Sequence, residues 1–471
     1  IYNNLCPNKL PPNPYQVTVR KLCDPLEQNV VVDSAAVVLY YPAPRSATGE
    51  DVLELHIHGG PATQKAVLSA ISKVASNTRL PIRYAEPGEF TKRAFINQKL
   101  DLAQVEALSD EISAETEQQR RAAVRGNSQK LCSIYEDWRE KLLHARGEIE
   151  ALIDFSEDQS FEESPKSLFE NVTNQVNVII KEAEKHKFAS QRAELLKRGI
   201  KISLLGPANS GKSSLLNIIV GREASIVSQE VGTTRDVIEA SIDLKGYLCS
   251  FADTAGLRDE HESKNSQSKS IGVAELEGIK RAKMKAKSSD IVVVMTSIEL
   301  SDSPNNCLIK YDAFSLSLAA KTSNVLIVIN KIDLIDSPEK LRSIIHDFKS
   351  NVVGCIFPTK LPPIIQISCY NHSHGAIFGD DKSNIQVFLS ELVKYFKKMT
   401  NLPPYLEDLI GVTERQKLIL DSFCSQLQEF KDETDIVLAA ENLRLAAMCL
   451  NKITGRGNTG DVEELLGVIF E

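Results

Sequence analysis

The sequence predicts an α/β domain with a doubly wound, mostly parallel sheet, inserted into an α-helical domain and preceded by a small α+β domain. Between residues 198 and 400, short apolar runs typical of buried strands alternate with stretches of helical pattern. On both sides of that segment, apolar residues recur at helical spacing, and before residue 98 short strand-like runs are separated by prolines. The length of 471 residues suits about three domains of ~150 residues each.

Composition and charge narrow the classes of function. Acidic residues (63) outnumber basic residues (55), which gives a net charge of -8 and a pI near 5.7. A protein that binds nucleic acid mainly through a basic surface would not have this balance, so such a role requires a local patch or a partner. No run reaches the ~18 apolar residues of a membrane span, so none is expected. The nine cysteines contain no C-x-x-C pair, and we expect reduced thiols.

Residues 1–97 are expected to form the small α+β domain. The runs 30–32 and 36–41 read as strands, and 52–57 alternates apolar and polar residues as a further strand. His56 and His58 fall on one face of that strand, but no third ligand is nearby in the sequence, so a metal site is disfavoured.

Residues 98–197 and 401–471 are expected to form the two parts of the helical domain. Ser164 and Pro165 read as the N-cap and first residue of a helix that ends near residue 187. After Pro404, helical spacing returns between residues 436 and 450. Coiled-coil seams are possible, but bundle cores are favoured. A long helix is predicted by a stripe of Leu131, Ile134, Trp138, Leu142, Ala145, Ile149 and Leu152.

Residues 198–400 are expected to form the inserted α/β domain. Strands are predicted at 202–205, 247–252, 291–295, 325–329 and 364–367. Three polar tracts, 258–270, 300–324 and 371–384, are rich in Ser, Asn, Lys and Asp and are predicted to be loops.

Residues 206–213 match the pattern G-x-x-x-x-G-K-S between a predicted strand and a predicted helix. Glycines in such a segment let backbone N–H groups close around phosphates, and the helix N-terminus favours an anion. Lys212 is placed to reach the β- and γ-phosphates, and Ser213 to ligate Mg²⁺. The segment therefore predicts a P-loop.

Three further motifs predict that the nucleotide is GTP. Residues 232–236 contain Thr234, a candidate second Mg²⁺ ligand, and residues 253–256 form the Asp-x-x-Gly segment near the metal and γ-phosphate. Residues 330–333 end in Asp333, whose carboxylate can accept from the N1–H and 2-amino groups of guanine, which adenine lacks. At 368–370, Ser-Cys-Tyr replaces the usual Ser-Ala-Lys, so the base is expected to be held there mainly by backbone. The predicted GTP contacts are Asn209, Ser210, Gly211, Lys212, Ser213, Ser214, Asp253, Thr254, Ala255, Gly256, Asn330, Lys331, Asp333 and Ser368.

Catalysis requires more than these contacts. In small GTPases a Gln after Asp-x-x-Gly orients the attacking water, but here Leu257 follows, which can neither donate nor accept a hydrogen bond. Glu275 is the candidate residue that orients the water or acts as a base. The alternative is a solvated Glu at a helix start, and the residues alone leave both open.

Two further segments are specific, Glu-Pro-Gly-Glu-Phe-Thr-Lys-Arg-Ala-Phe at 86–95 and Lys-Leu-Asp-Leu-Ala-Gln at 99–104. Through them the chain shows a resemblance to the tRNA-modification GTPase family MnmE/TrmE over nearly its whole length. It extends to Gly-Glu-Asp-Val-Leu-Glu-Leu at 49–55, His-Gly-Gly-Pro at 58–61, Glu-Asn-Leu-Arg-Leu-Ala at 441–446 and Ile-Thr-Gly at 453–455, besides the inserted GTPase motifs.

The resemblance implies a homodimer that works with a flavin-dependent partner of the MnmG/GidA type. Together the two would install a carboxymethylaminomethyl or taurinomethyl group at C5 of the wobble uridine of tRNAs. The N-terminal domain would bind 5-formyl-tetrahydrofolate or a related one-carbon folate, with Glu54 and Lys99 at the positions of family folate contacts. From the residues alone, these two would read as a strand-face carboxylate and a helix-start cation.

The resemblance also implies that a K⁺ ion, rather than an arginine finger, offsets the charge that develops during GTP hydrolysis. The matching potassium ligands are Asn209 in the P-loop and Ser228, Glu230 and Thr233 after it. Glu275 falls at the position of the family's catalytic glutamate, which explains how Leu257 is tolerated.

Two features bear on the source and ends of the chain. Family members close with Phe-Cys-x-Gly-Lys, whereas this sequence stops at Glu471 after Phe470, so we expect the terminal Cys and Lys to lie beyond it. The long polar tracts and the Ser-Cys-Tyr variant favour a mitochondrial-matrix member over a bacterial cytoplasmic one.

Two rival functions share the nucleotide motifs. A ribosome-assembly GTPase that acts as an rRNA-binding switch should carry an RNA-binding appendage, and no Gly-x-x-Gly loop with basic flanks or basic tail is evident. A dynamin-like membrane GTPase should carry a segment that contacts lipid, and none is evident.

Overall fold

A computed structural model of the chain describes residues 1–77, 82–126, 129–154, 165–223, 225–229, 240–253, 284, 286–300, 307–335, 337–370 and 383–455. The chain divides into two compact units. One comprises residues 1–106, 129–179 and 419–471, and the other residues 107–128 and 180–418.

The N-terminal part of the first unit is a three-stranded antiparallel sheet with helices beside it. The elements are α1 (Tyr2–Leu5), β1 (Thr18–Cys23), β2 (Val31–Tyr41), β3 (Val52–His56), α2 (Pro61–Asn77) and α3 (Glu89–Ile96). The strand order is β1-β2-β3, so β3 has one neighbour in this sheet. Runs 30–32 and 36–41 are one strand rather than two, because β2 pairs with β1 continuously from Val31 to Val38 across an irregularity near Asp33.

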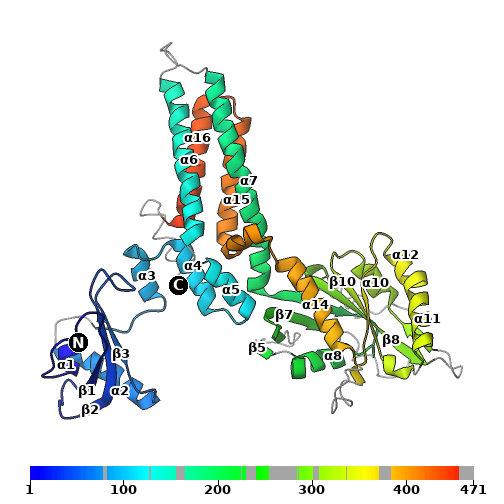
Figure 1. Ribbon diagram of the computed structural model, residues 1–471, viewed down its shortest axis with the longest axis horizontal. Coiled ribbons are helices and arrows are strands. Elements are labelled where there is room, and N and C mark those ends of the chain that lie inside the picture. The colour runs from blue at the N-terminus through cyan, green and yellow to red at the C-terminus, as the bar shows by residue number, and fades with distance from the viewer. Residues whose placement is uncertain are drawn as a thin grey trace, which may run out of the picture. The chain divides into compact units, whose positions relative to one another are not determined.

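The helices of the first unit are held together by aromatic side chains. Trp138 of α6 stacks on Phe423 of α15 with ring centroids 6.0 Å apart, and Phe169 of α7 stacks on Phe430 of α15 at 5.3 Å. In Figure 1 the long helices α6, α7, α15 and α16 run side by side as a bundle. The helices that lie wholly or partly in this unit are α4 (Leu102–Ile112), α6 (Gln129–Asp154), α7 (Pro165–Arg198), α15 (Glu414–Asp432) and α16 (Ile436–Thr454), whereas α5 (Glu117–Gly126) belongs to the second unit.

The predicted end of α7 near residue 187 is wrong. The helix continues to Arg198, because Ala189 and Leu196 still lie on a buried face, and it ends at Gly199, which has φ of +79°. A glycine in the left-handed region is a common end to a helix. The extra turns bring the helix directly to the first strand of the α/β sheet.

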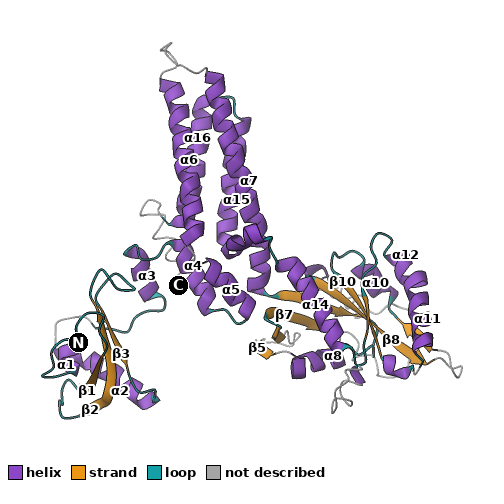
Figure 2. Cartoon of the chain, in the orientation of Figure 1, coloured by secondary structure: helices purple, strands orange, loops and turns teal. Residues whose placement is uncertain are grey.

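The second unit contains the predicted doubly wound sheet, shown by the orange arrows in Figure 2. The strand order is β11-β10-β8-β4-β7-β6-β5, with β9 paired to β8. The pairs β10–β11, β10–β8, β4–β8 and β4–β7 are parallel, and the pairs β6–β7, β5–β6 and β8–β9 are antiparallel. The strands are β4 (Ile200–Leu205), β5 (Ser225–Gln229), β6 (Ala240–Leu244), β7 (Tyr247–Asp253), β8 (Ile291–Leu300), β9 (Cys307–Lys310), β10 (Val325–Asn330) and β11 (Ile364–Gln366).

Two apolar cores cover the two faces of this sheet. Val293 of β8 packs in the core that contains α8 and α14, whereas the next residue, Val294, packs in the core that contains α10 and α11. Successive strand residues point to opposite faces, so continuous apolar runs such as β8 and β10 are buried on both sides. The remaining elements are α8 (Lys212–Ile218), η1 (Ile219–Glu223), α10 (Ala313–Ala319), η3 (Ile332–Leu334), α11 (Pro338–Phe348), η4 (Lys349–Val353), α12 (Gly354–Ile356), α14 (Ile385–Thr400) and η5 (Pro404–Gly411).

The predicted fold class is confirmed, with one correction among the loops. Tract 300–324 is not a loop throughout, because β9 pairs with the end of β8 and Asp312 caps α10 by accepting from the Phe314 and Ser315 N–H groups. Tract 258–270 and most of tract 371–384 lie outside the described residues. Among the helices that the structure describes, none is long and apolar enough to cross a membrane.

Candidate nucleotide and N-terminal sites

The P-loop follows β4, and two of its glycines are required by their surroundings. Gly206 has φ of +141°, and a Cβ there would lie 2.1 Å from the Met295 carbonyl oxygen of β8. Gly211 has φ of +95°, and its Cβ would lie 2.0 Å from Asn330 Nδ2. A side chain at either position would both strain the backbone and fill the space where the loop closes. This geometry fits the backbone cradle that a phosphate chain needs.

The Lys212 side chain turns back toward its own loop. The residue is 8% exposed, and Nζ donates to the Gly206 and Pro207 carbonyl oxygens at 3.1 and 2.8 Å. A buried ammonium group needs acceptors, and phosphate oxygens are stronger acceptors than carbonyl oxygens because they are charged. The lysine is therefore held at the loop, where it can exchange carbonyl acceptors for phosphate.

Asn330, at the end of β10, joins three segments of the site. Its side chain is buried, Nδ2 donates to the Ser210 carbonyl oxygen at 2.9 Å, and Oδ1 accepts from the Cys369 N–H at 3.2 Å. Residues 330–333, the motif predicted to read the guanine base (the base-reading motif), are thus bonded directly to the P-loop and to the segment after β11.

The carboxylate of Asp333 is held by Ser368. Ser368 Oγ donates to Asp333 Oδ1 at 2.5 Å, and Lys331 between the two motifs has φ of +64°. Burial raises the pKa of the adjacent Cys369 thiol to about 11, so this side chain stays neutral. Cys369 contributes its backbone N–H to the site, which suits a segment that holds a base by main chain.

The other predicted nucleotide and metal residues are less fully described. Ser213 and Ser214 are exposed in the first turn of α8, and Asn209 is exposed with φ of +61°. Hydroxyl and amide oxygens there suit Mg²⁺ and K⁺ as donor types. The backbones of Ser228 and Asp253 lie in β5 and β7, while their side chains are not described. Outside the described residues lie Glu230, Thr233, Thr234, Thr254, Ala255, Gly256, Leu257 and Glu275.

The two predicted folate residues lie on different elements of the N-terminal domain. Glu54 is exposed on β3, and its Oε2 lies 3.2 Å from His56 Nε2. Lys99 is exposed after α3, and its N–H donates to the Ala94 carbonyl oxygen at 2.8 Å. Within the described residues, no group of three or more His, Cys, Asp or Glu side chains is arranged to hold a metal ion.

Sequence reasoning missed the residues that shape the loop beside Lys99. Asn97 Nδ2 donates to the Thr48 carbonyl oxygen at 2.8 Å, and Arg93 pairs with Glu50 at 2.9 Å. A Cβ on Gly49 would lie 2.8 Å from Asn97 Cβ and 3.3 Å from Lys99 Cε. Residues 93–99 and 48–50 overlap the segments that carry the family resemblance, but their pairing across more than 40 positions carries no sequence signal.

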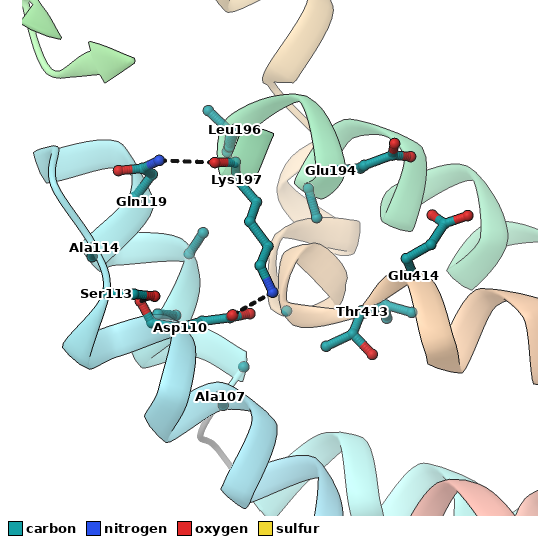
Figure 3. A pocket seen from close by; sticks show the side chains of 16 residues that line it. Ala107, Asp110, Ser113, Ala114, Gln119, Glu194, Leu196, Lys197, Thr413 and Glu414 are labelled. Carbon is teal, nitrogen blue, oxygen red and sulfur yellow. Dashed lines mark hydrogen bonds and ion pairs between the residues drawn. The ribbon is translucent and has the colours of Figure 1, made fainter. Parts of the chain in front are cut away.

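A cavity of about 200 Å³ in the second unit was also missed (Figure 3). Its wall contains seven alanines and glycines, and at its rim Lys197 pairs with Asp110 at 2.5 Å while Gln119 Nε2 donates to the Lys197 carbonyl oxygen at 3.0 Å. The lining comes from α4, α5, the end of α7 and the segment that runs from the end of η5 to the start of α15, so only folding assembles it.

Two family models together match almost the entire chain. A model described as the MnmE helical domain matches residues 102–471, and one described as the GTP-binding protein TrmE N-terminus matches residues 1–99.

Curated relatives are similar over almost the entire chain. The tRNA modification GTPase MnmE of Rickettsia rickettsii (strain Sheila Smith) is 36% identical over 446 residues, which covers 94% of this chain and 87% of that protein. The protein of the same name from Rickettsia prowazekii is 37% identical over 452 residues, with coverage of 94% and 87%.

Solved structures resemble part of the chain. The G domain of the T. maritima FeoB iron transporter is 17% identical and covers 43% of this chain and 99% of its own, with a TM-score of 0.24. Era in complex with MgGDPNP and a segment of 16S ribosomal RNA is 19% identical and covers 48% and 66%, with a TM-score of 0.29. At these values neither likeness bears on function.

Proposed function

The chain belongs to the tRNA modification GTPase family MnmE/TrmE, and we propose that it couples K⁺-dependent GTP hydrolysis to modification of C5 of the wobble uridine of tRNA. The added group would be of the carboxymethylaminomethyl or taurinomethyl type. Because the chain belongs to this family, we propose this function in place of the ribosome-assembly and membrane-GTPase alternatives. The observation that supports GTP binding is the pair of hydrogen bonds made by the Asn330 side chain. They join the base-reading motif to the P-loop and to the Cys369 backbone.

In the proposed site, the described residues bind and orient the nucleotide. Backbone N–H groups of the P-loop and Lys212 would hold the phosphates, and Asp333, fixed by Ser368, would read guanine. Ser213 and Thr234 would hold Mg²⁺, which neutralises phosphate charge when bound. We propose residues 198–400 as the GTPase domain, placed between helical segments 98–197 and 401–471.

Potassium dependence is motivated by two residues. Asn209 offers an exposed amide in the P-loop, and Leu257 cannot orient water. Asn209, Ser228, Glu230 and Thr233 would hold the ion, whose fixed charge would stabilise the transition state. GTP turnover measured in equimolar K⁺ and Na⁺ should be at least ~10-fold faster in K⁺, and equal rates would exclude the cation mechanism.

Glu275 is proposed as the residue that orients the attacking water. Changing Glu275 to Ala should lower turnover by about 100-fold or more while GTP affinity stays within a few-fold. A Glu277→Ala variant, two positions along the same segment, is the matched control. Turnover preserved in the Glu275 variant would remove it from the mechanism.

The N-terminal domain is proposed to bind 5-formyl-tetrahydrofolate or a related one-carbon folate through Glu54 and Lys99. Both side chains are exposed, and the loop beside Lys99 is anchored by Asn97. Calorimetry should detect folate binding by the wild-type protein and a loss of at least ~10-fold in a Glu54→Ala, Lys99→Ala variant. Unchanged binding in that variant would argue against these two contacts.

We propose that the protein acts as a homodimer with tRNA and an MnmG/GidA-like FAD protein in the mitochondrial matrix. The net charge of -8 supports a complex in which a partner supplies much of the basic surface for tRNA. Capture of a flavoprotein on immobilised protein, followed by mass determination of the complex, tests the partner and the dimer together. Fractionation of cells of the source organism tests the compartment.

A further inference from the structure

A buried carboxylate and an exposed imidazole are joined at the end of β3. The Asp33 side chain is 0% exposed, whereas that of His58 is 63% exposed. His58 Nδ1 lies 2.9 Å from Asp33 Oδ1, and the His58 backbone N–H donates to Asp33 Oδ2 at 2.9 Å. The Ala35 N–H also donates to Asp33, at 2.9 Å. The carboxylate is therefore fixed by donors from both segments that meet at this turn.

These contacts determine which nitrogen of the ring carries hydrogen. Burial alone would raise the pKa of Asp33, but the hydrogen bonds from His58 and Ala35 outweigh it, and the pKa is lowered. An ionised carboxylate can only accept, so Nδ1 of His58 must be the N–H donor. Nε2 is then the ring nitrogen that is turned away from the bond to Asp33.

A second histidine–aspartate pair in the chain is an ordinary surface pair, and it differs from the His58–Asp33 pair in distance and burial. His346 Nδ1 lies 3.9 Å from Asp347 Oδ1, and those side chains are 79% and 68% exposed. Such a pair is solvated and contributes little. At His58, by contrast, the Asp33 carboxylate is buried and fixes the orientation of the imidazole through Nδ1. The other ring nitrogen, Nε2, can contact a ligand.

The backbone directly after His58 is open at Gly59. Gly59 and Gly60 have no φ in the left-handed region, and a Cβ on Gly59 would meet no described atom within 4 Å. A Cβ on Gly60 would meet Thr63 Oγ1 at 3.4 Å, which is ordinary contact. The packing of the described residues therefore does not require glycine at either position, and glycine leaves the backbone there open to close approach by a ligand.

We propose that His58, held by Asp33, is the general acid–base residue of the one-carbon chemistry in the N-terminal domain. The inference rests on the proposed folate function of this domain. As the one-carbon unit leaves a folate nitrogen for the nucleophilic carbon of the tRNA base, the C–N bond breaks and its electron pair stays on nitrogen. That nitrogen takes the proton from His58 Nε2, the imidazole becomes neutral, and Asp33 stays ionised.

The surroundings of the ring fit this role. Glu54, the proposed folate contact, lies four residues earlier and is exposed on β3, the strand that ends at His56 just before His58. The elements around the turn also carry Tyr40 and Tyr41 on β2, His56 on β3, and Lys65 and Lys73 on α2, and Lys73 is paired with Asp24 at 2.6 Å. Asp33 is thus the carboxylate bonded directly to the ring, and Glu54 is the carboxylate bonded to His56.

The test separates proton transfer from a purely structural bond to Asp33. A His58→Asn variant keeps a side-chain N–H at the position of Nδ1 and so keeps the bond to Asp33, but it has no Nε2. In the complex with flavoprotein and tRNA, single-turnover modification by this variant should be ~100-fold slower than wild type.

Folate affinity, measured by calorimetry, and GTP turnover of the His58→Asn variant should stay within about 3-fold of wild type. A His346→Asn variant is the matched control, with all three properties unchanged. Modification at the wild-type rate by His58→Asn would overturn the inference in favour of a structural tether. A parallel loss of folate affinity would overturn it in favour of a binding role. Absence of folate binding by the wild-type protein would instead refute the proposed folate function itself.

Discussion

At the scale of single residues, the nucleotide site depends on side chains that bond to backbone. Asn330 bonds to the Ser210 carbonyl and the Cys369 N–H, and Lys212 bonds to two carbonyls of its own loop. A buried polar side chain with both ends bonded resists displacement, because breaking either bond leaves a buried group unpaired. The P-loop is therefore held in place by the base-reading motif.

Gly211 should be intolerant of any side chain. Its φ of +95° disfavours L residues, and its Cβ would lie 2.0 Å from Asn330 Nδ2. Gly211→Ala should lower the affinity for a fluorescent GTP analogue at least ~10-fold, since both strain and displacement of Asn330 cost about 1 kcal/mol or more. Gly221→Ala is the control, because a Cβ there meets no described atom within 4 Å. Equal affinities in the two variants would contradict this role for Asn330.

His186 of α7 should make the protein acid-sensitive. Burial lowers its pKa from about 6.5 to about 4, so the folded state keeps this ring neutral where the unfolded state protonates it. Stability from the neutral ring is complete above pH 6.5 and is lost as pH falls toward 4, by roughly 3 kcal/mol. Thermal unfolding at pH 7 and 4.5 should show a smaller drop for His186→Gln than for wild type. Parallel pH curves would exclude this histidine as a source.

At the scale of elements, helix ends are set by caps that the sequence carries. Asp435 accepts from the Val437 and Leu438 N–H groups and begins α16, and Gly455 with φ of +75° ends it. The sheet depends instead on burial from both sides, so β8 and β10 have no polar face to mark their register.

Loss of the Asp435 cap should loosen the first turn of α16. Asp435→Ala should cost about 1 kcal/mol locally, and amide hydrogen exchange at Val437 and Leu438 should become ~5-fold faster. Asp435→Asn keeps a capping oxygen and should exchange at nearly the wild-type rate. Unchanged exchange in the Ala variant would show that packing, not capping, begins the helix.

At the scale of the whole molecule, the helical segment of the second unit is bonded within itself at the rim of the cavity of Figure 3 and is bonded to the sheet at the turn between β6 and β7. Gln119 and Asp110 bond to Lys197 at the end of α7, and the Gln118 N–H donates to the Gly246 carbonyl in the turn between β6 and β7. Polar bonds surround a space of about 200 Å³ lined by small side chains. The cavity is therefore bordered by specific polar bonds, and its interior is incompletely packed.

Filling this cavity should stabilise the second unit. Ala193 lines it from α7, and Leu is nearly as good a helix former as Ala. Ala193→Leu buries about three additional methylene-sized groups and should raise the melting temperature of the unit by a few degrees, as measured by calorimetry. Ala189→Leu, at a fully buried position of the same helix, should lower it by overpacking. A fall in both variants would contradict available space at Ala193.

The sequence predicted well where local chemistry decides structure. The P-loop, the strand before it and the long helices follow from fixed spacing of glycines, a lysine and apolar residues, because these patterns act over a single turn or strand. The end of α7 and the elements within 300–324 were not predicted, since Gly199 and Asp312 are weak signals beside a polar composition. The predicted GTP, metal and folate contacts stay predictions of function.

By itself, the sequence determined the fold class and the P-loop, because each depends on residues close together in the chain. Tertiary structure alone brought Asp33 to His58 across 25 positions, Asn330 to Ser210 across 120, and Asn97 to Thr48 across 49. Each of these is a single polar bond whose partner is selected by which strands and turns pack together. A bond of that kind has no periodicity, so no pattern in the sequence could reveal it.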